Sequence, residues 1–297
     1  MRKTVFLTVI LIAGLAAAQE QPPQQQQPPA QQDPWQFWVR ANAQLYDNFF
    51  EAPNGRPQDD VTALFGEAGA SVGFAKSFRA YGQVNYLHYD EEGLDSSPGF
   101  RVGLRGDAHP HSFDVYAEDL RNRPTFDVGD EFDRADIRTL AATYEYRSSH
   151  DWSAGADGEL QQQNFKITTS RDNDFRSAGA SVRWRGSRLF SPEVGVRFGN
   201  RDVDDDRLSY GQRDVYLQIR SSLTPKLYLS GRYRNRKRDY DNLGREDKRN
   251  QITLSADYTL VPNLILNLYG SHETTGVNQP NRDFKTALYV AGLTWRF

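Results

Sequence analysis

From Trp35 onward the sequence consists of stretches in which apolar and polar residues alternate one by one. DVYLQIRSS and QITLSADYTL are two of these stretches, and ALYVAGLTWRF, which reaches Phe297, is a third. Successive side chains of a strand point to opposite faces, whereas a helix brings together residues three and four apart. The period of two therefore predicts strands that have one apolar face and one polar face.

About fourteen such stretches follow one another, and the breaks between them are alternately short and long. Single-chain barrels of bacterial outer membranes have an even number of strands, tight periplasmic turns and longer outside loops. We therefore expect an all-β fold, a transmembrane up-and-down antiparallel β-barrel with both termini in the periplasm, in the outer membrane of a bacterial cell. The expected strands lie near residues 35–47, 62–76, 78–90, 99–108, 111–121, 136–147, 151–164, 174–186, 191–201, 212–222, 226–238, 249–260, 263–274 and 284–297.

A soluble β-sandwich or solenoid is the competing architecture, because alternation occurs there too. Such a fold would have to bury a face made largely of Ala, Gly and Leu against a second sheet. It would need neither an export signal nor aromatic residues gathered at strand ends. A helical membrane protein is excluded, because no apolar run after residue 18 approaches the roughly 18 residues that a membrane helix requires.

The N-terminus has the pattern of an export signal. Arg2 and Lys3 precede an apolar run that ends in three alanines, which predicts a secretory signal peptide over residues 1–18. Residues 19–34 are rich in Gln and Pro and predict a flexible periplasmic tail. The alternative for this tail is a recognition arm that binds a periplasmic partner. Residues 35–297 would then form the barrel.

The composition excludes several classes of function. The chain has no cysteine, which excludes a disulfide scaffold and a thiolate metal site, and its net charge of −3 argues against nucleic-acid binding. No GxSxG sequence or paired Asp–His pattern suggests a hydrolase. The acidic loops lack the spacing of a calcium-binding loop. We therefore expect no enzymatic activity, no metal and no cofactor.

Aromatic residues gather near the predicted short turns and at the ends of the barrel segment. In a barrel with periplasmic termini these positions share one height, at which aromatic side chains meet the membrane interface. Trp38 belongs to the group by its position in the sequence. The strand that ends in Trp-Arg-Phe also resembles the signal that the barrel-assembly machinery reads. The expected partners are therefore this machinery, outer-membrane lipid and lipopolysaccharide. The candidate girdle residues are Trp35, Trp152, Trp184, Trp295 and Phe297.

The polar face of the barrel would line a water-filled lumen, so its charged residues are the candidates for solute selection. The arginines among them lie mainly on the later strands, and the acidic residues lie on the earlier strands. A basic wall would then face a partly acidic one, with a field that favours polar or anionic solutes. The alternative is that these charges only solvate the lumen and pair across strands. The candidates are Arg183, Arg185, Arg197, Arg201, Arg220, Arg232, Arg234, Arg236, Asp107, Asp114, Glu118, Asp157 and Glu159.

The segment from Arg232 to Phe297 resembles the C-terminal barrel of surface lipoprotein assembly modifiers and related porin-like bacterial barrels. The shared features are an Arg/Tyr strand running into RDYD (Arg238–Asp241), a charged loop, the stretch LSADYTLVPNLILNLYGSHE, and a final strand ending in aromatic-Arg-Phe. The resemblance implies an outer-membrane barrel of about fourteen strands. In that family lipoprotein export involves an N-terminal tetratricopeptide-type domain, where this chain has its Gln/Pro tail.

A barrel of about fourteen strands is closer in size to barrels that enclose an aqueous channel than to eight-stranded barrels filled by side chains. The sequence therefore predicts a passive, porin-like pore for small hydrophilic solutes. The alternative is a barrel that assists the export or display of a surface lipoprotein or polysaccharide.

Overall fold

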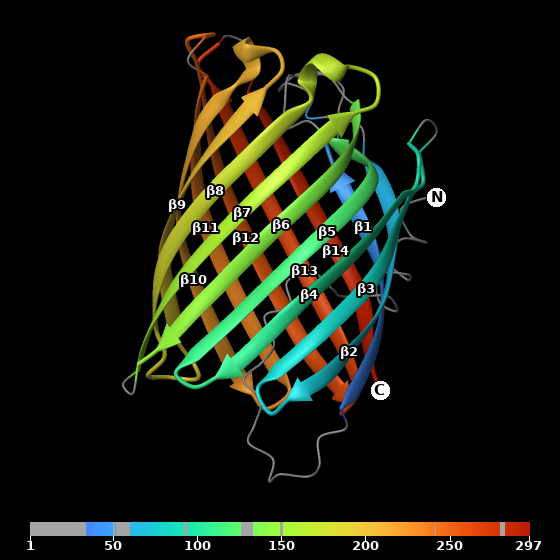
Figure 1. Ribbon diagram of the computed structural model, residues 1–297, viewed down its shortest axis with the longest axis vertical. Helices are drawn as coiled ribbons and strands as arrows, with labels where there is room; N and C mark the ends of the chain where they lie inside the picture. Colours follow the sequence, from blue (N-terminus) through green and yellow to red (C-terminus); the bar gives the residue numbers. More distant parts are fainter. Residues whose placement is uncertain are drawn as a thin grey trace, which may run out of the picture.

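A computed structural model describes residues 34–49, 51, 60–91, 94–125, 133–148, 151–240, 242–279 and 283–297. In this part of the chain, antiparallel strands β1 to β14 form one closed barrel in sequence order (Figure 1). The predicted all-β barrel is thereby confirmed. The predicted signal peptide and residues 19–33 of the predicted tail lie outside the described residues.

The strands differ little in length, and two short 3₁₀ helices lie in the loops before β8 and β10. These helices are η1 (Thr169–Arg171) and η2 (Asp206–Leu208). None of the described helices is long and apolar enough to cross a membrane. The strands are β1 (Trp35–Asp47), β2 (Val61–Ala75), β3 (Phe78–Tyr89), β4 (Ser97–Ala108), β5 (His111–Thr125), β6 (Asp133–Arg147), β7 (Trp152–Phe165), β8 (Asn173–Trp184), β9 (Ser191–Val203), β10 (Tyr210–Thr224), β11 (Leu227–Tyr240), β12 (Arg245–Val261), β13 (Leu264–Val277) and β14 (Phe284–Arg296).

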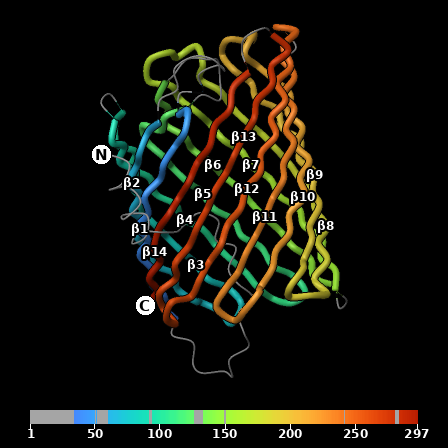
Figure 2. Tube along the Cα trace, turned by 180° about the vertical axis from the view of Figure 1, so that it is seen from behind, coloured from blue at the N-terminus to red at the C-terminus, as the bar shows by residue number. Residues whose placement is uncertain are grey.

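The barrel is closed by the pairing of its first and last strands, which lie side by side in Figure 2. The seam runs antiparallel from Trp38 opposite Arg296 to Asp47 opposite Ala287. Beyond it, Phe37 and Phe297 exchange two backbone hydrogen bonds, of 3.3 and 2.9 Å. Closure leaves no strand edge unpaired, which is the condition for a sheet to cross hydrocarbon.

The predicted strand limits are close to the observed ones, and the largest differences lie at the ends near the long loops. β12 begins at Arg245 rather than 249, β6 begins at Asp133 rather than 136, and β5 ends at Thr125 rather than 121. At this end both faces of the strands are polar, so the alternation of apolar residues fades. The backbone ladder nevertheless continues, with Arg238 of β11 opposite Asp247 of β12.

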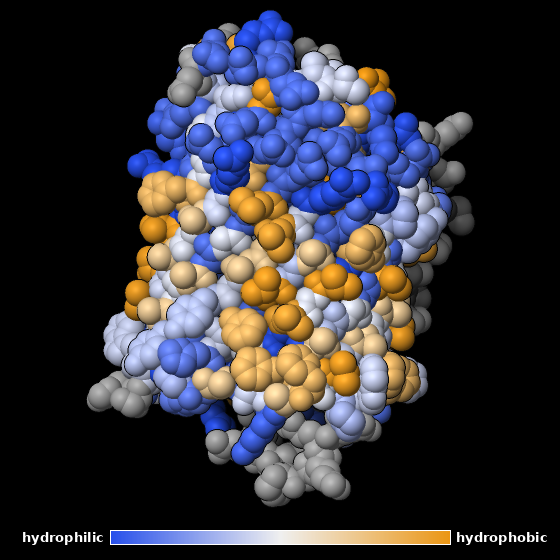
Figure 3. Space-filling model, viewed as in Figure 1, coloured by the Kyte–Doolittle hydropathy of each residue, from blue (hydrophilic) through white to orange (hydrophobic). Residues whose placement is uncertain are grey.

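The outward side chains form an apolar band around the barrel. Figure 3 shows this band over the middle and lower part of one face, with a hydrophilic surface above it. Within the band Leu217 is 45% exposed and Leu254 63% exposed. An apolar surface that extends over so many strands indicates contact with lipid rather than water.

The five candidate girdle residues occupy outward positions at the end of the barrel that bears the short turns. Trp152 of β7 lies directly opposite Trp184 of β8, and the rings of Trp295 and Phe297 stack with their centroids 5.4 Å apart. Trp38 differs, because it points inward and its Nε1 donates a hydrogen bond of 3.0 Å to Glu67 Oε1. Contact of the girdle with the membrane interface stays a prediction.

Replacing Leu217 with Arg is expected to reduce the free energy of unfolding by about 2–4 kcal/mol, the cost of an arginine at mid-membrane depth on the lipid face of a barrel. Urea titration of the protein refolded in lipid vesicles measures this loss. The control is Gln218→Arg, which places the same charge at the next residue, on the inner face. An equal loss in both variants would show that Leu217 does not face lipid.

Replacing Gly292 with Ala is expected to weaken the seam between β1 and β14. A Cβ atom at Gly292 would lie 2.3 Å from the carbonyl oxygen of Ala41 and 2.4 Å from Asn42 Cβ, so the backbones must move apart. Overpacking of this kind costs about 1–3 kcal/mol. The control is Gly270→Ala, whose nearest neighbour would be a side-chain atom of Tyr289 at 3.7 Å. Urea midpoints that are equal for the two variants would contradict this account of the seam.

Candidate functional site

The inner wall of the barrel is the candidate functional site, and its residues follow from the strand register. On β11 the outward residues include Tyr233, which is 46% exposed, so the even-numbered residues of that strand point inward. The same alternation places all the predicted lumen residues except Arg185 at inward positions. Arg185 lies beyond the end of β8, in the turn before β9, with Glu145 and Arg147 among its charged neighbours. The role of the predicted lumen residues in solute selection stays a prediction.

Four arginines of β11 form a row along the inner wall. They recur at every second residue, so adjacent members are separated by about 7 Å along the strand. Arg238 was not among the predicted residues, because the expected strand ended there. It is 2% exposed, and its Nε donates a hydrogen bond of 3.1 Å to Gln212 Oε1 on β10. We call this set the arginine row: Arg232, Arg234, Arg236 and Arg238.

Two arginines of the row share a single carboxylate. Asp214 of β10 is 1% exposed and accepts hydrogen bonds from Arg234 Nε at 3.1 Å and from Arg236 Nε at 3.2 Å. Sequence reasoning missed Asp214, although it shares the parity of the predicted Arg220 on the same strand. One negative charge for two guanidinium groups leaves this part of the wall with an excess of positive charge.

Glu193 of β9 is a second carboxylate that sequence reasoning missed. Its Oε2 lies 2.8 Å from Arg183 Nε and 3.1 Å from Arg220 Nη2, so it too serves two arginines. Its parity on β9 is that of the predicted Arg197, which was the available signal. A buried carboxylate between two cations is held firmly, because each partner compensates the cost of removing it from water.

Each of the predicted acidic residues of the earlier strands is paired with an arginine. Glu118 pairs with Arg101 at 2.7 Å, and Asp114 pairs with Arg105 at 2.7 Å. Asp107 pairs with Arg147 at 2.8 Å. Asp157 and Glu159 both contact Arg197, at 2.7 and 3.5 Å. Pairing within the lumen, the alternative considered above, therefore describes the acidic residues, whereas the arginine row keeps its excess charge.

Glycines let aromatic rings lie flat against the inner wall. A Cβ atom at Gly195 would lie 2.3 Å from Tyr216 Cζ, and one at Gly103 would lie 2.5 Å from Tyr81 Cζ. Only glycine leaves room for a ring at this position on the neighbouring strand. The flat rings present their faces to guanidinium groups. Arg232 Cζ lies 4.0 Å from the centroid of the Tyr216 ring.

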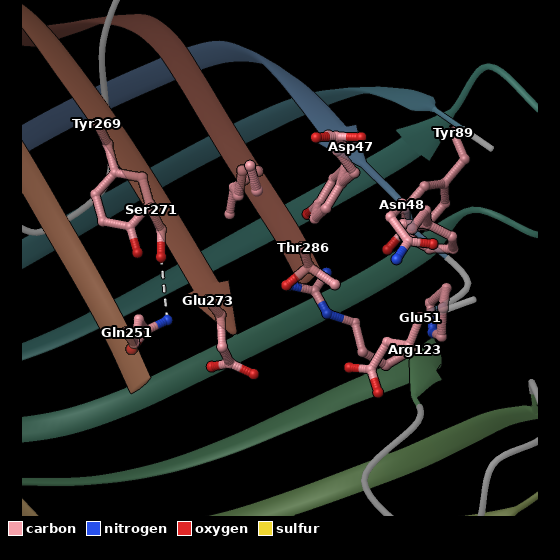
Figure 4. Close-up of a pocket in the computed structure, with 15 residues that line it drawn as sticks. Asp47, Asn48, Glu51, Tyr89, Arg123, Gln251, Tyr269, Ser271, Glu273 and Thr286 are labelled. Atoms are coloured by element: carbon pink, nitrogen blue, oxygen red, sulfur yellow. Dashed lines mark hydrogen bonds between the residues drawn. The ribbon is translucent and has the colours of Figure 1, made fainter. Parts of the chain in front are cut away.

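A cavity of about 280 Å³ lies at the end of the lumen near the long loops (Figure 4). Its lining includes Tyr89, Arg123 and Glu273, together with Glu51 from the segment after β1. Glu51 lies 3.7 Å from Arg249 of β12, so this segment reaches across the inner wall. Polar and charged side chains thus gather at this end of the lumen.

One aspartate of the acidic loop before β10 is paired within that loop. Asp205, at the start of η2, accepts hydrogen bonds from Arg207 Nε at 2.9 Å and Nη2 at 2.7 Å. The bonds from Arg207 lower the pKa of Asp205 below its ordinary value. Among the described residues no group of three or more His, Asp and Glu side chains is placed to hold a metal ion.

Comparison with known proteins supports the same architecture. Residues 177–297 match the family described as "Putative beta-barrel porin 2". This stretch contains most of β8 and all the strands that follow, and so the whole arginine row. No curated protein matches the sequence.

Two solved structures of an outer-membrane protein are similar to this barrel. A loop L8 deletion mutant of OmpT of Vibrio cholerae has a TM-score of 0.53 and 9% sequence identity, over 89% of this chain and 100% of that chain. OmpT of Vibrio cholerae expressed in the outer membrane has a TM-score of 0.53 and 10% identity, over 90% of this chain and 99% of that chain. At these identities the likeness shows the fold alone, a closed antiparallel β-barrel.

Proposed function

We propose that this protein is a passive, porin-like pore of the bacterial outer membrane that passes small hydrophilic solutes and favours anions. The observation that carries the proposal is the arginine row, in which Arg234 and Arg236 share the single carboxylate of Asp214. A wall of one sign in a confined lumen attracts counter-ions and raises their local concentration. The proposal includes no catalytic step.

The size of the barrel and the arrangement of its loops support this proposal. Barrels with far more than eight strands enclose water instead of being filled by side chains. The short turns and Phe297 lie at one end in Figure 1, and the longer loops with η1 and η2 lie at the other. Outer-membrane barrels keep short turns in the periplasm, which would place both termini there and the cavity of Figure 4 at the outer mouth.

The resemblance to surface lipoprotein assembly modifiers rests on Arg232 to Phe297, and the family match names a porin over residues 177–297, which contain that segment. Export or display of a surface lipoprotein or polysaccharide stays a prediction of the sequence. A periplasmic partner for residues 19–34 stays a prediction as well. The pore is the function that the geometry of the inner wall supports best.

Conductance in planar bilayers tests the pore. The wild-type protein is expected to show steady conductance. In a KCl gradient its reversal potential should have the sign that indicates a preference for chloride over potassium. The double variant Arg232→Gln/Arg234→Gln retains the pair of Arg236 with Asp214 and should shift the reversal potential toward cation preference, because two positive charges are lost from the wall.

The control for this experiment is the double variant Arg105→Gln/Asp114→Asn, which removes an ion pair of the opposite wall and leaves the net charge of the lumen unchanged. It should leave the reversal potential close to that of the wild type. Absence of steady conductance would remove the pore function, and a wild-type preference for cations would remove the role given to the arginine row.

Outward cations just above the apolar band suggest a contact with lipopolysaccharide. Arg213 of β10 lies opposite Lys237 of β11, which lies opposite Lys248 of β12, so three cations are adjacent on the outer surface. Both lysines also pair with the carboxylate of Glu246, at 2.6 and 2.7 Å, so the group keeps an excess of positive charge. On β10, Arg213 is the next outward residue after the apolar Val215, and on β12 one outward residue, Asn250, separates Lys248 from the apolar Ile252. Guanidinium and ammonium groups are ordinary ligands of phosphate, which the lipid of the outer leaflet bears.

The double variant Arg213→Gln/Lys248→Gln should reduce the stabilisation that added lipopolysaccharide gives to the detergent-purified protein, because two phosphate ligands are lost. The shift of the unfolding temperature on addition of lipopolysaccharide measures this effect. Lys226→Gln, in the turn between β10 and β11 at the other end of the barrel, is the control. A shift of wild-type size in the double variant would remove these residues from the contact.

A further inference from the structure

Arg232 differs from the other members of the arginine row in what holds it. Arg234 and Arg236 bind Asp214, and Arg238 is hydrogen bonded to Gln212. Arg232 forms no ion pair with a carboxylate among the described residues, and its guanidinium group instead lies over the ring of Tyr216. A cation held by an aromatic face keeps its in-plane N–H groups available to a further partner.

Tyr216 is fixed by contacts of its ring and of its hydroxyl group. Gly195 of β9 gives the ring room to lie flat on the wall, and the Tyr216 hydroxyl donates a hydrogen bond of 2.8 Å to Glu193 Oε1. Glu193 is itself held by Arg183 and Arg220. The platform under Arg232 is therefore rigid, which reduces the entropy lost when its guanidinium group binds a ligand.

The charges around Arg232 are mainly positive. Arg234 and Arg197 are close enough to repel the Arg232 guanidinium group, and Glu193 is its acidic neighbour. The negative charge of Glu193 is already divided between Arg183 and Arg220. An anion with more than one charge would relieve the repulsion between the guanidinium groups and accept hydrogen bonds in pairs, as oxyanions do from arginine.

We propose that Arg232, positioned by Gly195 and Tyr216, anchors a binding subsite in the lumen for a doubly charged oxyanion, such as a phosphate or a dicarboxylate. The subsite rests on the proposed function insofar as the anion must enter the lumen to reach it. Arg232 binds the anion, Arg234 contributes a second charge, and Tyr216 is a positioning residue that does not touch the ligand.

The opposite wall provides a matched arrangement that lacks the available cation. Tyr81 lies flat over Gly103 and its hydroxyl donates a hydrogen bond of 2.9 Å to Asp114, as Tyr216 does to Glu193. There, however, Arg105 is paired with Asp114 and its Cζ lies 5.6 Å from the ring centroid. The same tyrosine–glycine pair thus occurs on both walls, but within the described part of the chain Arg105 has a paired carboxylate and Arg232 has none.

Isothermal titration calorimetry of the detergent-purified protein tests the subsite, with inorganic phosphate and succinate as probes at constant ionic strength set by KCl. Binding of either probe supports the proposal, and the two arms distinguish an inorganic from an organic anion. Arg232→Gln should weaken binding by about ten-fold or more, the effect of losing one charged hydrogen-bonding group. Tyr216→Leu should weaken it by a similar factor although every arginine is retained.

Tyr216→Phe should bind within about two-fold of the wild type, because the ring remains and only a hydrogen bond is lost. Tyr81→Leu is the control and should bind as the wild type does. Folding of each variant is judged by heat-modifiable mobility on gels. If Tyr216→Leu does not fold, Gly195→Ala is used instead, because it displaces the Tyr216 ring without removing it. It should lose binding in the same way.

The proposal is overturned if neither probe binds the wild type, if Arg232→Gln binds as well as the wild type, or if Tyr81→Leu weakens binding as much as Tyr216→Leu. Calorimetry does not depend on ion flow, so the two proposals fail separately. If the protein conducts but binds neither probe, only the subsite is rejected. If it binds a probe but does not conduct, only the pore is rejected.

Discussion

The structure depends on the pairing of backbone groups around a closed sheet. Hydrocarbon offers no hydrogen bonds, so each N–H and C=O group at membrane depth must find its partner in the protein. The seam between β1 and β14 completes this pairing, and Phe37 and Phe297 extend it by one more pair of bonds. Gly292 allows the two backbones to approach at the seam, where any side chain would meet Ala41 and Asn42.

Closure also determines where the charges go. With the apolar faces turned toward lipid, the polar faces are confined within the barrel, where an uncompensated charge is costly. The acids of the earlier strands are paired with cations, as Glu118 is with Arg101. The later strands have fewer acids than arginines, and Asp214 and Glu193 each serve two. The excess of positive charge on one wall follows from this uneven supply of carboxylates.

The flat aromatic rings connect packing with charge. A tyrosine that stands upright would obstruct the lumen, whereas a glycine on the next strand lets the ring lie along the wall. The ring face then supports a guanidinium group, and the hydroxyl reaches a carboxylate, as in the contacts of Tyr216 with Arg232 and Glu193. Three interactions thereby stiffen this part of the inner wall.

The sequence by itself determined the architecture, because the contrast between lipid and water imposes a period of two that is readable strand by strand. It also placed Arg232, Arg234 and Arg236 on one face of their strand, as the structure does on β11. It failed at the ends of β5, β6 and β12, where both faces are polar and the period carries no information.

Only the tertiary structure decided which charges meet. Asp214 and Glu193 lie on strands rich in other polar residues, and their partners belong to neighbouring strands whose register the sequence does not state. The same holds for Trp38, which turns inward to Glu67 although its neighbours in the sequence suggested the membrane interface. Side-chain periodicity is a local property of each strand, whereas ion pairs depend on the relative shift of two strands, which is set when the barrel closes.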